Sequence, residues 1–456
     1  MKRRELLKAV GIATMAAKFG INRAMAAETS ATAKFALGVR FDALPPKAVD
    51  WAKTAILDCL GVAIAGSRET SSQIVAKLAR EEGKKPEATL YGHAFKSSAA
   101  QAAFVNGISA HATDFDHSFV VGGQPSAPII PAIFALGETL SSSGKQVIEA
   151  YAAGFEVAAN LALAGQSSEG GGVPPGAYGA AIACAKLLGL TESEIQMSLG
   201  IASAMVSGLG TTQGTMGKPL GVGLAARAGI EAAQMAKNGF TAGAPDLPAL
   251  DKLGREWALE KYGVRLKPYP CGGLTHTSIY ATIQLRNQNS IKPDAVESIE
   301  VRVPQNTADT IKYRIPKSGL EGKFSMGYLV ARVLIDGKVT LDSFTDAAVR
   351  DPKILALVEK VEMQVDLSLP PSTSADGSRA AVVTIRLKNG QTLSRNERFP
   401  KGSSQFPMTA DELKDKVRTC AHGIIGNDGC ERAITYVSTF ETMPSVKPLA
   451  ELLRGS

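Results

Sequence analysis

Residues 106–132 read NGISAHATDFDHSFVVGGQPSAPIIPA, and they place four polar side chains within eight positions: His111, Asp114, His117 and Ser118. The pattern predicts a helix over residues 106–119 that ends at a Gly-Gly-Gln-Pro turn. In such a helix Asp114, His117 and Ser118 stand at i, i+3 and i+4 and share one face. A carboxylate, an imidazole and a hydroxyl that converge in this way can transfer protons or bind a polyacid. The same spacing is also typical of a solvated helix face.

The first half of the chain continues this helical pattern on both sides of the opening stretch. Glycine, proline and serine separate the apolar segments, and a capping box, Thr191-x-x-Glu194, opens one of them. Alternating strands are not expected here. Besides 106–119, helices are predicted over residues 45–65, 128–140, 144–163, 179–188, 191–206 and 220–238.

The pattern changes after Lys267, where apolar residues begin to alternate with polar ones. Strands are predicted over residues 299–303, 361–365 and 383–387, and Asn389-Gly390 predicts a hairpin turn after the last of them. Helices are expected over residues 275–286 and 324–334, and Thr409-x-x-Glu412 opens a helical tail. The predicted fold class is therefore multi-domain α and α+β, with a large all-helical domain interrupted by a smaller α+β lid. The boundaries are 35–267 for the helical domain, 268–398 for the lid and 399–456 for C-terminal helices that return to the helical domain.

The composition is that of an ordinary globular protein, with 45% hydrophobic and 20% charged residues over 456 positions. The net charge is +7, but residues 1–26 alone carry six basic residues and one acidic residue. The rest of the chain is close to neutral, so a nucleic-acid partner is not expected. The five cysteines form no C-x-x-C pair, so neither a disulfide framework nor a zinc site is predicted. A bridge between Cys420 and Cys430 stays open.

The N-terminus is typical of a twin-arginine signal peptide. Arg3-Arg4-Glu5-Leu6-Leu7-Lys8 fits R-R-x-hydrophobic-L-K, an apolar run follows, and Ala24-Met25-Ala26 provides an A-x-A cleavage site. The apolar run is too short for a stable membrane span. We therefore expect residues 1–26 to engage the twin-arginine export machinery and to be removed. The mature protein is expected in the periplasm, without a membrane partner after processing.

Several segments resemble the MmgE/PrpD family, which includes 2-methylcitrate dehydratases, cis-aconitate decarboxylases and iminodisuccinate epimerases. The opening stretch, NG-x-x-AH-x-x-DFD and then P-S-A-P-x-I-P-A, resembles the family's signature helix and turn. The resemblance implies a helical domain with an α+β lid, a homodimer and a reaction without a cofactor. Further similar segments are 58–66, 154–159, 221–239, 267–271, 323–325 and 336–340.

The resemblance also implies which residues form the site. Asp114 and Ser118 match the family's aspartate and hydroxyl positions, Lys218 matches its pocket lysine and His276 its second-domain histidine. Tyr313 lies near a family tyrosine, although the intervening lengths differ. The predicted catalytic residues are Asp114, His117, Lys218 and His276, with Ser118, Gln124 and Tyr313 binding the substrate. No cluster has metal-ligand spacing, so no metal is expected.

Two family histidines are missing, and these departures bear on the reaction. Gln124-Pro125 stands where family members commonly have His-Pro, and Val173-Pro174 stands at a second such position. A glutamine exchanges hydrogen bonds but not protons near neutral pH. His117 is gained where the family has the second member of an aspartate pair, and it is a candidate to take over proton transfer.

The expected function is a cofactor-independent lyase, a dehydratase or decarboxylase, acting on a small di- or tricarboxylate. Such reactions build negative charge on a polyanion, so the site needs cations and a positioned acid or base. Two alternatives stay open: an isomerase or epimerase of a dicarboxylate on the same scaffold, and a non-catalytic periplasmic acid-binding protein.

Overall fold

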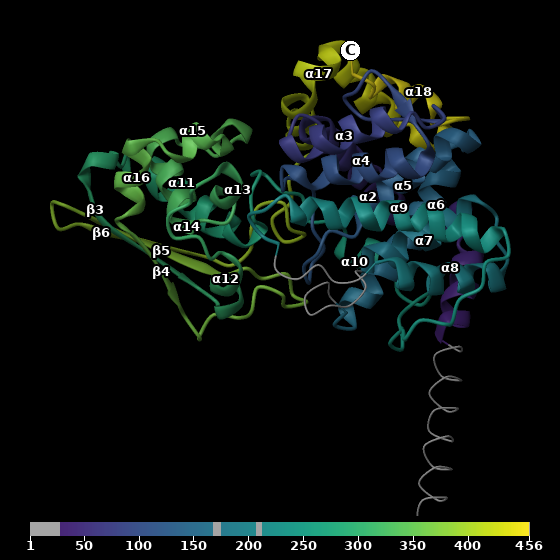
Figure 1. Ribbon diagram of the computed structural model, residues 1–456. Helices are drawn as coiled ribbons and strands as arrows, with labels where there is room; N and C mark the ends of the chain where they lie inside the picture. The colour runs from purple at the N-terminus through teal and green to yellow at the C-terminus, as the bar shows by residue number, and fades with distance from the viewer. Residues whose placement is uncertain (1–27, 167–174, 207–211, 456) are drawn as a thin grey trace, which may run out of the picture.

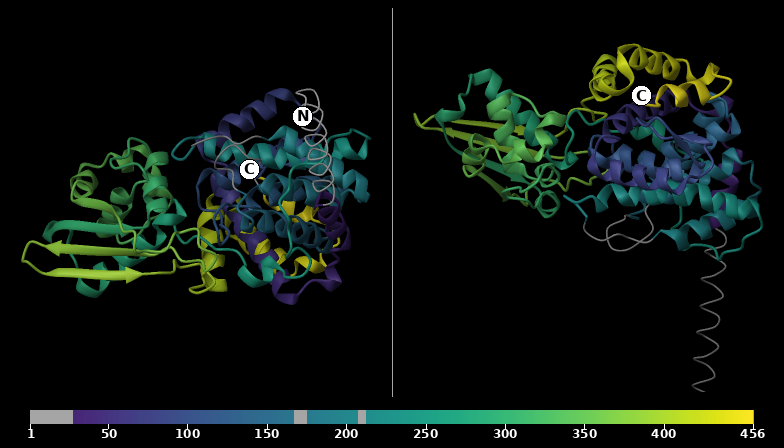
Figure 2. Two further views of the ribbon diagram at one scale, coloured as in Figure 1. Left: turned by 90° about the horizontal axis from the view of Figure 1, so that it is seen from below. Right: turned by 45° about the horizontal axis from the view of Figure 1, so that its top comes forward.

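The structure is a computed structural model that describes residues 28–166, 175–206 and 212–455. A large helical body and a smaller body built on a sheet lie side by side (Figure 1), and the chain passes between them near residues 267 and 400. The yellow C-terminal helices lie on the helical body in both further views (Figure 2). The predicted fold class is confirmed: a mainly helical chain with an inserted α+β unit.

The helical body has small residues at its helix crossings. A Cβ added to Gly107 of α4 would lie 3.0 Å from the Cα of Gly223 in α9, so these two backbones meet almost directly. Tight crossings of this kind explain the abundance of glycine and alanine in this half. The main helices are α2 (Pro46–Gly66), α3 (Thr70–Glu82), α4 (Ala99–Ala112), α5 (Ser126–Leu140), α6 (Gly144–Leu163), α7 (Pro175–Leu187), α8 (Glu192–Met205), α9 (Gly217–Lys237) and α10 (Ala258–Tyr262).

The smaller body has its own core around a four-stranded sheet with the order β4-β3-β5-β6. The strands are β3 (Val296–Val303), β4 (Val361–Val365), β5 (Ala381–Leu387) and β6 (Thr392–Glu397). β3 and β4 are parallel, and the other pairs are antiparallel. Helices α11 (His276–Asn289) and α14 (Met326–Asp336) pack against the sheet. Short helices complete this body: α12 (Gln305–Thr310), α13 (Gly319–Gly322), α15 (Asp346–Val349) and α16 (Pro352–Val358).

The chain returns to the helical body through α17 (Ala410–Ser438) and α18 (Lys447–Leu452). Thr409 and Glu412 form the expected capping box at the start of α17. The helix is kinked at Gly426, whose φ of 72° is left-handed and suits glycine. Residues of α17 share one hydrophobic core with α2, so the C-terminal segment closes the helical body.

Two sequence expectations need correction, and one open point is settled. The helix predicted over 106–119 ends at Ala112, because Asp114 adopts a left-handed φ of 52° that a helix cannot contain. The helical body also contains two short strands, since β1 (Ala88–Thr89) and β2 (Lys96–Ser97) pair antiparallel over two residues each. Strands of this length are too short to show an alternation of apolar and polar residues in the sequence. All five cysteines are buried free thiols, so Cys420 and Cys430 are not bridged. The predicted signal peptide lies outside the described residues, and none of the described helices is long and apolar enough to cross a membrane.

A buried carboxyl group on α6 fixes the segment that leads into the second body. The two side-chain oxygens of Glu156 accept hydrogen bonds from the backbone N–H groups of Ala258 and Leu259, each at 2.8 Å. Burial raises the pKa of Glu156 to about 7, although the two N–H groups oppose this shift. The folded protein therefore holds a proton that the unfolded chain releases above about pH 4.5.

We expect the free energy of unfolding to fall as pH rises from about 5 to 7. The pKa shift of Glu156 corresponds to about 3 kcal/mol of unfolding free energy. The loss of stability should level off above the folded-state pKa. Urea unfolding at several pH values measures this slope. The Glu156→Gln variant should lose most of it, and an unchanged slope in that variant would assign the pH dependence to other groups.

Candidate active site

The segment after α4 leaves the helix and turns its polar residues into the boundary between the two bodies. Asp114 has its left-handed backbone here, and residue 118 forms an antiparallel bridge with Arg265 through N–H···O bonds of 2.9 and 2.8 Å. Strained backbone of this kind persists where surrounding contacts over-determine it. The segment is therefore held at both ends, by α4 and by the strand-like bridge.

Asp114 lies among cations from three parts of the chain. Its Oδ1 accepts hydrogen bonds from Lys218 Nζ at 2.7 Å and from Lys267 Nζ at 3.1 Å. Lys267 is 1% exposed and also donates to the carbonyl oxygen of Asp114 at 2.9 Å. Burial would raise the pKa of Asp114, but attraction to Lys218, Lys267 and His111 holds it well below its usual range. Asp114 is consequently ionised at neutral pH and cannot supply a proton.

A second carboxylate orients the imidazole next to Lys218. His111 Nδ1 lies 2.9 Å from both oxygens of Asp116, and its Nε2 lies 2.5 Å from Lys218 Nζ. His111 Nδ1 donates to the Asp116 carboxylate, and Nε2 accepts from the Lys218 ammonium group. Burial opposes ionisation of Asp116, but His111 keeps the pKa of Asp116 below its ordinary value. Asp116 and His111 therefore hold the Lys218 ammonium group, which can itself give a proton to whatever it faces.

The smaller body contributes further groups to the same place. Lys323 Nζ donates to the carbonyl oxygen of Thr113 at 2.9 Å, and the Tyr313 hydroxyl donates to the carbonyl oxygen of Gln213 at 2.9 Å. Burial lowers the pKa of Lys323. Gly214 makes room for the Tyr313 ring, since a Cβ there would lie 2.5 Å from the ring and its hydroxyl. Tyr313 thus fixes the second body against the loop that precedes Lys218.

His276 lies at the start of α11 and is buried beside the same cations. Its Nε2 lies 3.3 Å from the carbonyl oxygen of Cys271, and its ring packs edge-on against Tyr269. Burial, together with the positive charges of Lys267 and Arg379, holds the pKa of His276 well below its usual range. The imidazole is neutral at physiological pH and serves as a hydrogen-bonding group.

Several buried polar atoms of this region lack a partner in the described part of the chain. They include Asp114 Oδ2, Ser118 Oγ and Thr113 Oγ1. Buried polar groups in proteins are nearly always hydrogen-bonded. Their gathering around a cationic cluster points to a polar, anionic ligand that completes these contacts.

His117 is not part of this cluster, and the prediction that it shares a helical face with Asp114 is wrong. Its Nδ1 lies 2.8 Å from Asp58 Oδ2, and Lys416 of α17 contacts the other oxygen of Asp58 at 2.6 Å. All three side chains are buried. Burial opposes ionisation of Asp58, but Lys416 and His117 lower its pKa to about 2. These contacts hold the loop against α2 and α17; a role of His117 in proton transfer stays a prediction.

Gln124 lies in the turn before α5 and is partly buried, and its side chain makes no hydrogen bond with the described residues. It leaves the position without a proton-exchanging group, as expected from the sequence. Val173 and the glycines before it lie outside the described residues.

His111, Asp114 and Asp116 bring potential metal-ligand atoms within 4.8 Å of one another. Lys218 fills the space that an ion would need, because its ammonium group contacts both His111 and Asp114. The group is therefore better suited to proton transfer than to metal binding.

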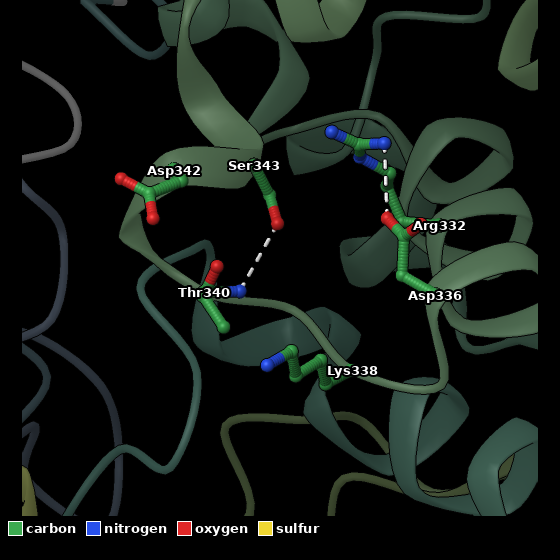
Figure 3. Close-up of a pocket in the computed structure, with 6 residues that line it drawn as sticks. All are labelled: Arg332, Asp336, Lys338, Thr340, Asp342 and Ser343. Carbon is green, nitrogen blue, oxygen red and sulfur yellow. Dashed lines mark hydrogen bonds and ion pairs between the residues drawn. The ribbon is translucent and has the colours of Figure 1, made fainter.

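A hollow of about 340 Å³ lies elsewhere, on the smaller body (Figure 3). Its charged groups compensate one another: Arg332 pairs with Asp336 at 2.9 Å. Ser343 Oγ accepts from the Thr340 backbone N–H at 3.0 Å, so it is also satisfied. Nothing there calls for a ligand as the Asp114 cluster does.

Four residues of the cluster were not among the predicted site residues. His111 and Asp116 belong to the stretch 106–132, but a continuous helix there would group Asp114 with His117 instead. Lys267 and Lys323 stand in two of the segments that resemble the family, 267–271 and 323–325, and this resemblance could have identified them as site residues. Both are buried lysines, and buried lysines are rare unless paired or functional.

Comparison with known proteins agrees with this architecture. The MmgE/PrpD N-terminal domain matches residues 30–262, and the MmgE/PrpD C-terminal domain matches residues 269–442. Cis-aconitate decarboxylase of Mus musculus is 28% identical over 92% of this chain and 91% of its own length. The Homo sapiens protein of that name is 26% identical over 92% of each chain, and that of Aspergillus terreus is 28% identical over 93% of this chain and 95% of its own.

Decarboxylases of this kind are lyases, so the prediction of an enzyme with lyase activity is confirmed. The two domains match in order and over most of the chain, and they meet close to the boundary between the helical body and the body built on the sheet. The protein belongs to the MmgE/PrpD family.

Proposed function

We propose that this enzyme removes CO2 from a small tricarboxylate of the cis-aconitate type without a cofactor. The buried contact of Asp114 with Lys218 and Lys267, completed by Lys323, is the observation that carries the proposal. It concentrates positive charge in a place shielded from water, where each cation acts more strongly than in solution. The names of the curated relatives support the same reaction class.

The cations stabilise the charge that decarboxylation creates. When the carboxylate on the methylene carbon leaves as CO2, its bonding electron pair moves through the neighbouring double bond. The pair reaches the carbon next to a remaining carboxylate, which spreads the negative charge onto oxygen. Lys267 contacts Asp114 and Lys323 contacts the carbonyl oxygen of Thr113, so both lie close enough to the cluster to suit this role.

A proton must then be added to that carbon. Lys218 is the donor in our proposal, since its ammonium group points at Asp114 and is backed by His111 and Asp116. Lys218 is partly exposed and regains a proton from solvent after each turnover, while His111 and Asp116 hold it in place. Asp114 holds Lys218 charged and in place. Neutral His276 and the unpartnered Ser118 hydroxyl bind substrate oxygens.

The proposal is tested by incubating the protein in deuterated water with cis-aconitate, citrate, 2-methylcitrate and propane-1,2-dicarboxylate, followed by proton NMR. We expect CO2 release from cis-aconitate, with one deuterium on the product. Loss of water from a hydroxy acid would make the enzyme a dehydratase. Exchange of deuterium without any loss would instead support the isomerase, and an unchanged panel would contradict the proposal.

We also propose that the protein is exported through the twin-arginine pathway to the periplasm and forms a homodimer. The N-terminal motif and the family resemblance support these points. Replacing Arg3 and Arg4 by lysine should keep the chain in the cytoplasm of a bacterial host, as cell fractionation would measure. Export of that variant would argue against the pathway, and a monomer in sedimentation would argue against the dimer.

A further inference from the structure

Two buried arginines form a cationic pair that the reaction described above does not use. Arg265 follows α10 and is 6% exposed, and Arg379 precedes β5 and is 5% exposed. Arg265 Nη2 donates to the carbonyl oxygens of Gly377 at 2.9 Å and Val120 at 3.3 Å. Neither guanidinium group forms an ion pair with a carboxylate of the described residues.

Each of the two groups also keeps a buried N–H without an acceptor in the described chain: Arg265 Nη1 and Arg379 Nε. The hydroxyl of Ser378, next to Arg379, is buried and unpartnered as well. Two buried like charges with unused donors are strongly unfavourable unless an anion joins them. Burial lowers the pKa of Arg379, and the positive charge of Arg265 lowers it further.

The arginine pair borders the Asp114 cluster. A Cβ built on Gly273 would lie 2.5 Å from Arg379 Nη1 and 3.6 Å from Lys267 Cε, so both side chains pass the same glycine. Lys267 in turn contacts Asp114. The backbone of Arg265 is held next to the segment that carries Asp114, because it forms an antiparallel bridge with residue 118. One small molecule can therefore reach both groups of cations.

We propose that Arg265 and Arg379 form a subsite for a substrate carboxylate other than the one that leaves as CO2. A carboxylate has two acceptor oxygens, so it can satisfy donors from both guanidinium groups and cancel their mutual repulsion. This inference rests on the proposed function, and it makes the pair the determinant that selects tricarboxylates over dicarboxylates.

The test compares two unreactive acids that differ by one carboxylate, propane-1,2,3-tricarboxylate and propane-1,2-dicarboxylate. Calorimetric titration at pH 7 and fixed ionic strength gives Kd for the wild-type protein and for Arg379→Gln and Arg265→Gln. Arg386→Gln serves as the matched control, because Arg386 is an exposed arginine on β5. The unfolding temperature of each protein is recorded without ligand.

In the arginine-pair variants, Kd for the tricarboxylate should rise ~10- to 100-fold, while Kd for the dicarboxylate changes by less than about twofold. Arg386→Gln should change neither. The unfolding temperature of Arg379→Gln should not fall, since removing its charge relieves repulsion; Arg265→Gln also loses the hydrogen bonds to Gly377 and Val120 and is judged by Kd alone. An equal effect on both acids, no effect on either, or a lower unfolding temperature of Arg379→Gln would overturn the subsite.

The titration requires no turnover, so it separates this inference from the proposed reaction. If the wild-type protein decarboxylates nothing but Arg379→Gln selectively loses the tricarboxylate, the subsite stands and the proposed reaction fails. If cis-aconitate is decarboxylated but both acids bind Arg379→Gln as they bind the wild type, the subsite alone is wrong.

Discussion

Lys218→Ala should reduce kcat for CO2 release by ~10³-fold or more. The change removes the ammonium group that contacts both Asp114 and His111. General acid catalysis and electrostatic stabilisation each contribute about 10²-fold or more in other enzymes, and this residue is expected to supply part of both. Steady-state measurement of CO2 release from cis-aconitate gives the effect.

Lys237→Ala is the matched control, because Lys237 stands at the other end of α9 and is exposed. It should keep the wild-type rate. Lys218→Arg should remain largely inactive, since a guanidinium group neither fits against His111 Nε2 nor releases a proton at neutral pH. If Lys218→Ala retained the wild-type rate, our assignment of the site would be wrong.

The largest effect on stability is expected from Asp58→Asn. The substitution leaves Lys416 buried with its charge unpaired and also weakens the contact with His117. Breaking a buried pair in this way costs about 3–5 kcal/mol of unfolding free energy. Denaturant unfolding of the variant and the wild type measures the difference.

Two further variants sharpen this test. Adding Lys416→Met to Asp58→Asn removes the stranded charge and should recover much of the lost stability. Glu81→Gln breaks an exposed pair with Lys77 at 3.8 Å and should cost no more than about 1 kcal/mol. A loss of similar size in Asp58→Asn and Glu81→Gln would show that the buried network contributes little.

The regular elements were largely predictable because their signals are local. α6 occupies the predicted residues 144–163, and the capping box at Thr191 opens α8 as expected. The pairing of β5 with β6 follows from the hairpin signal at Asn389-Gly390. Such elements depend on caps, turns and apolar periods that lie within one segment.

The arrangement of the site was less predictable, because it depends on contacts between distant segments. Asp114 leaves the helix through a left-handed conformation that its sequence does not announce. The spacing of a helix therefore predicts Asp114 next to His117, but His117 contacts Asp58, which in turn pairs with Lys416. Lys218 and Lys267 meet at Asp114 from 104 and 153 residues away. Only the resemblance to a family, and not a local pattern, could suggest the role of Lys218.

Gln124 stands where the family resemblance implies a histidine, and it cannot transfer a proton near neutral pH. The structure offers a different proton donor, Lys218, which His111 and Asp116 hold in place. His111→Gln should therefore lower kcat by ~10²-fold or more, whereas Gln124→Ala should affect KM more than kcat. A Gln124→Ala variant with an unchanged KM and a collapsed kcat would place the glutamine in the proton path instead.

Chelator-treated wild-type protein, incubated with cis-aconitate in deuterated water and followed by NMR, tests directly whether the lysines around Asp114 carry out decarboxylation and reprotonation on their own. We expect one CO2 released and one deuterium incorporated per molecule of product, and neither with Lys218→Ala. Unchanged cis-aconitate, with neither loss nor exchange, would contradict it.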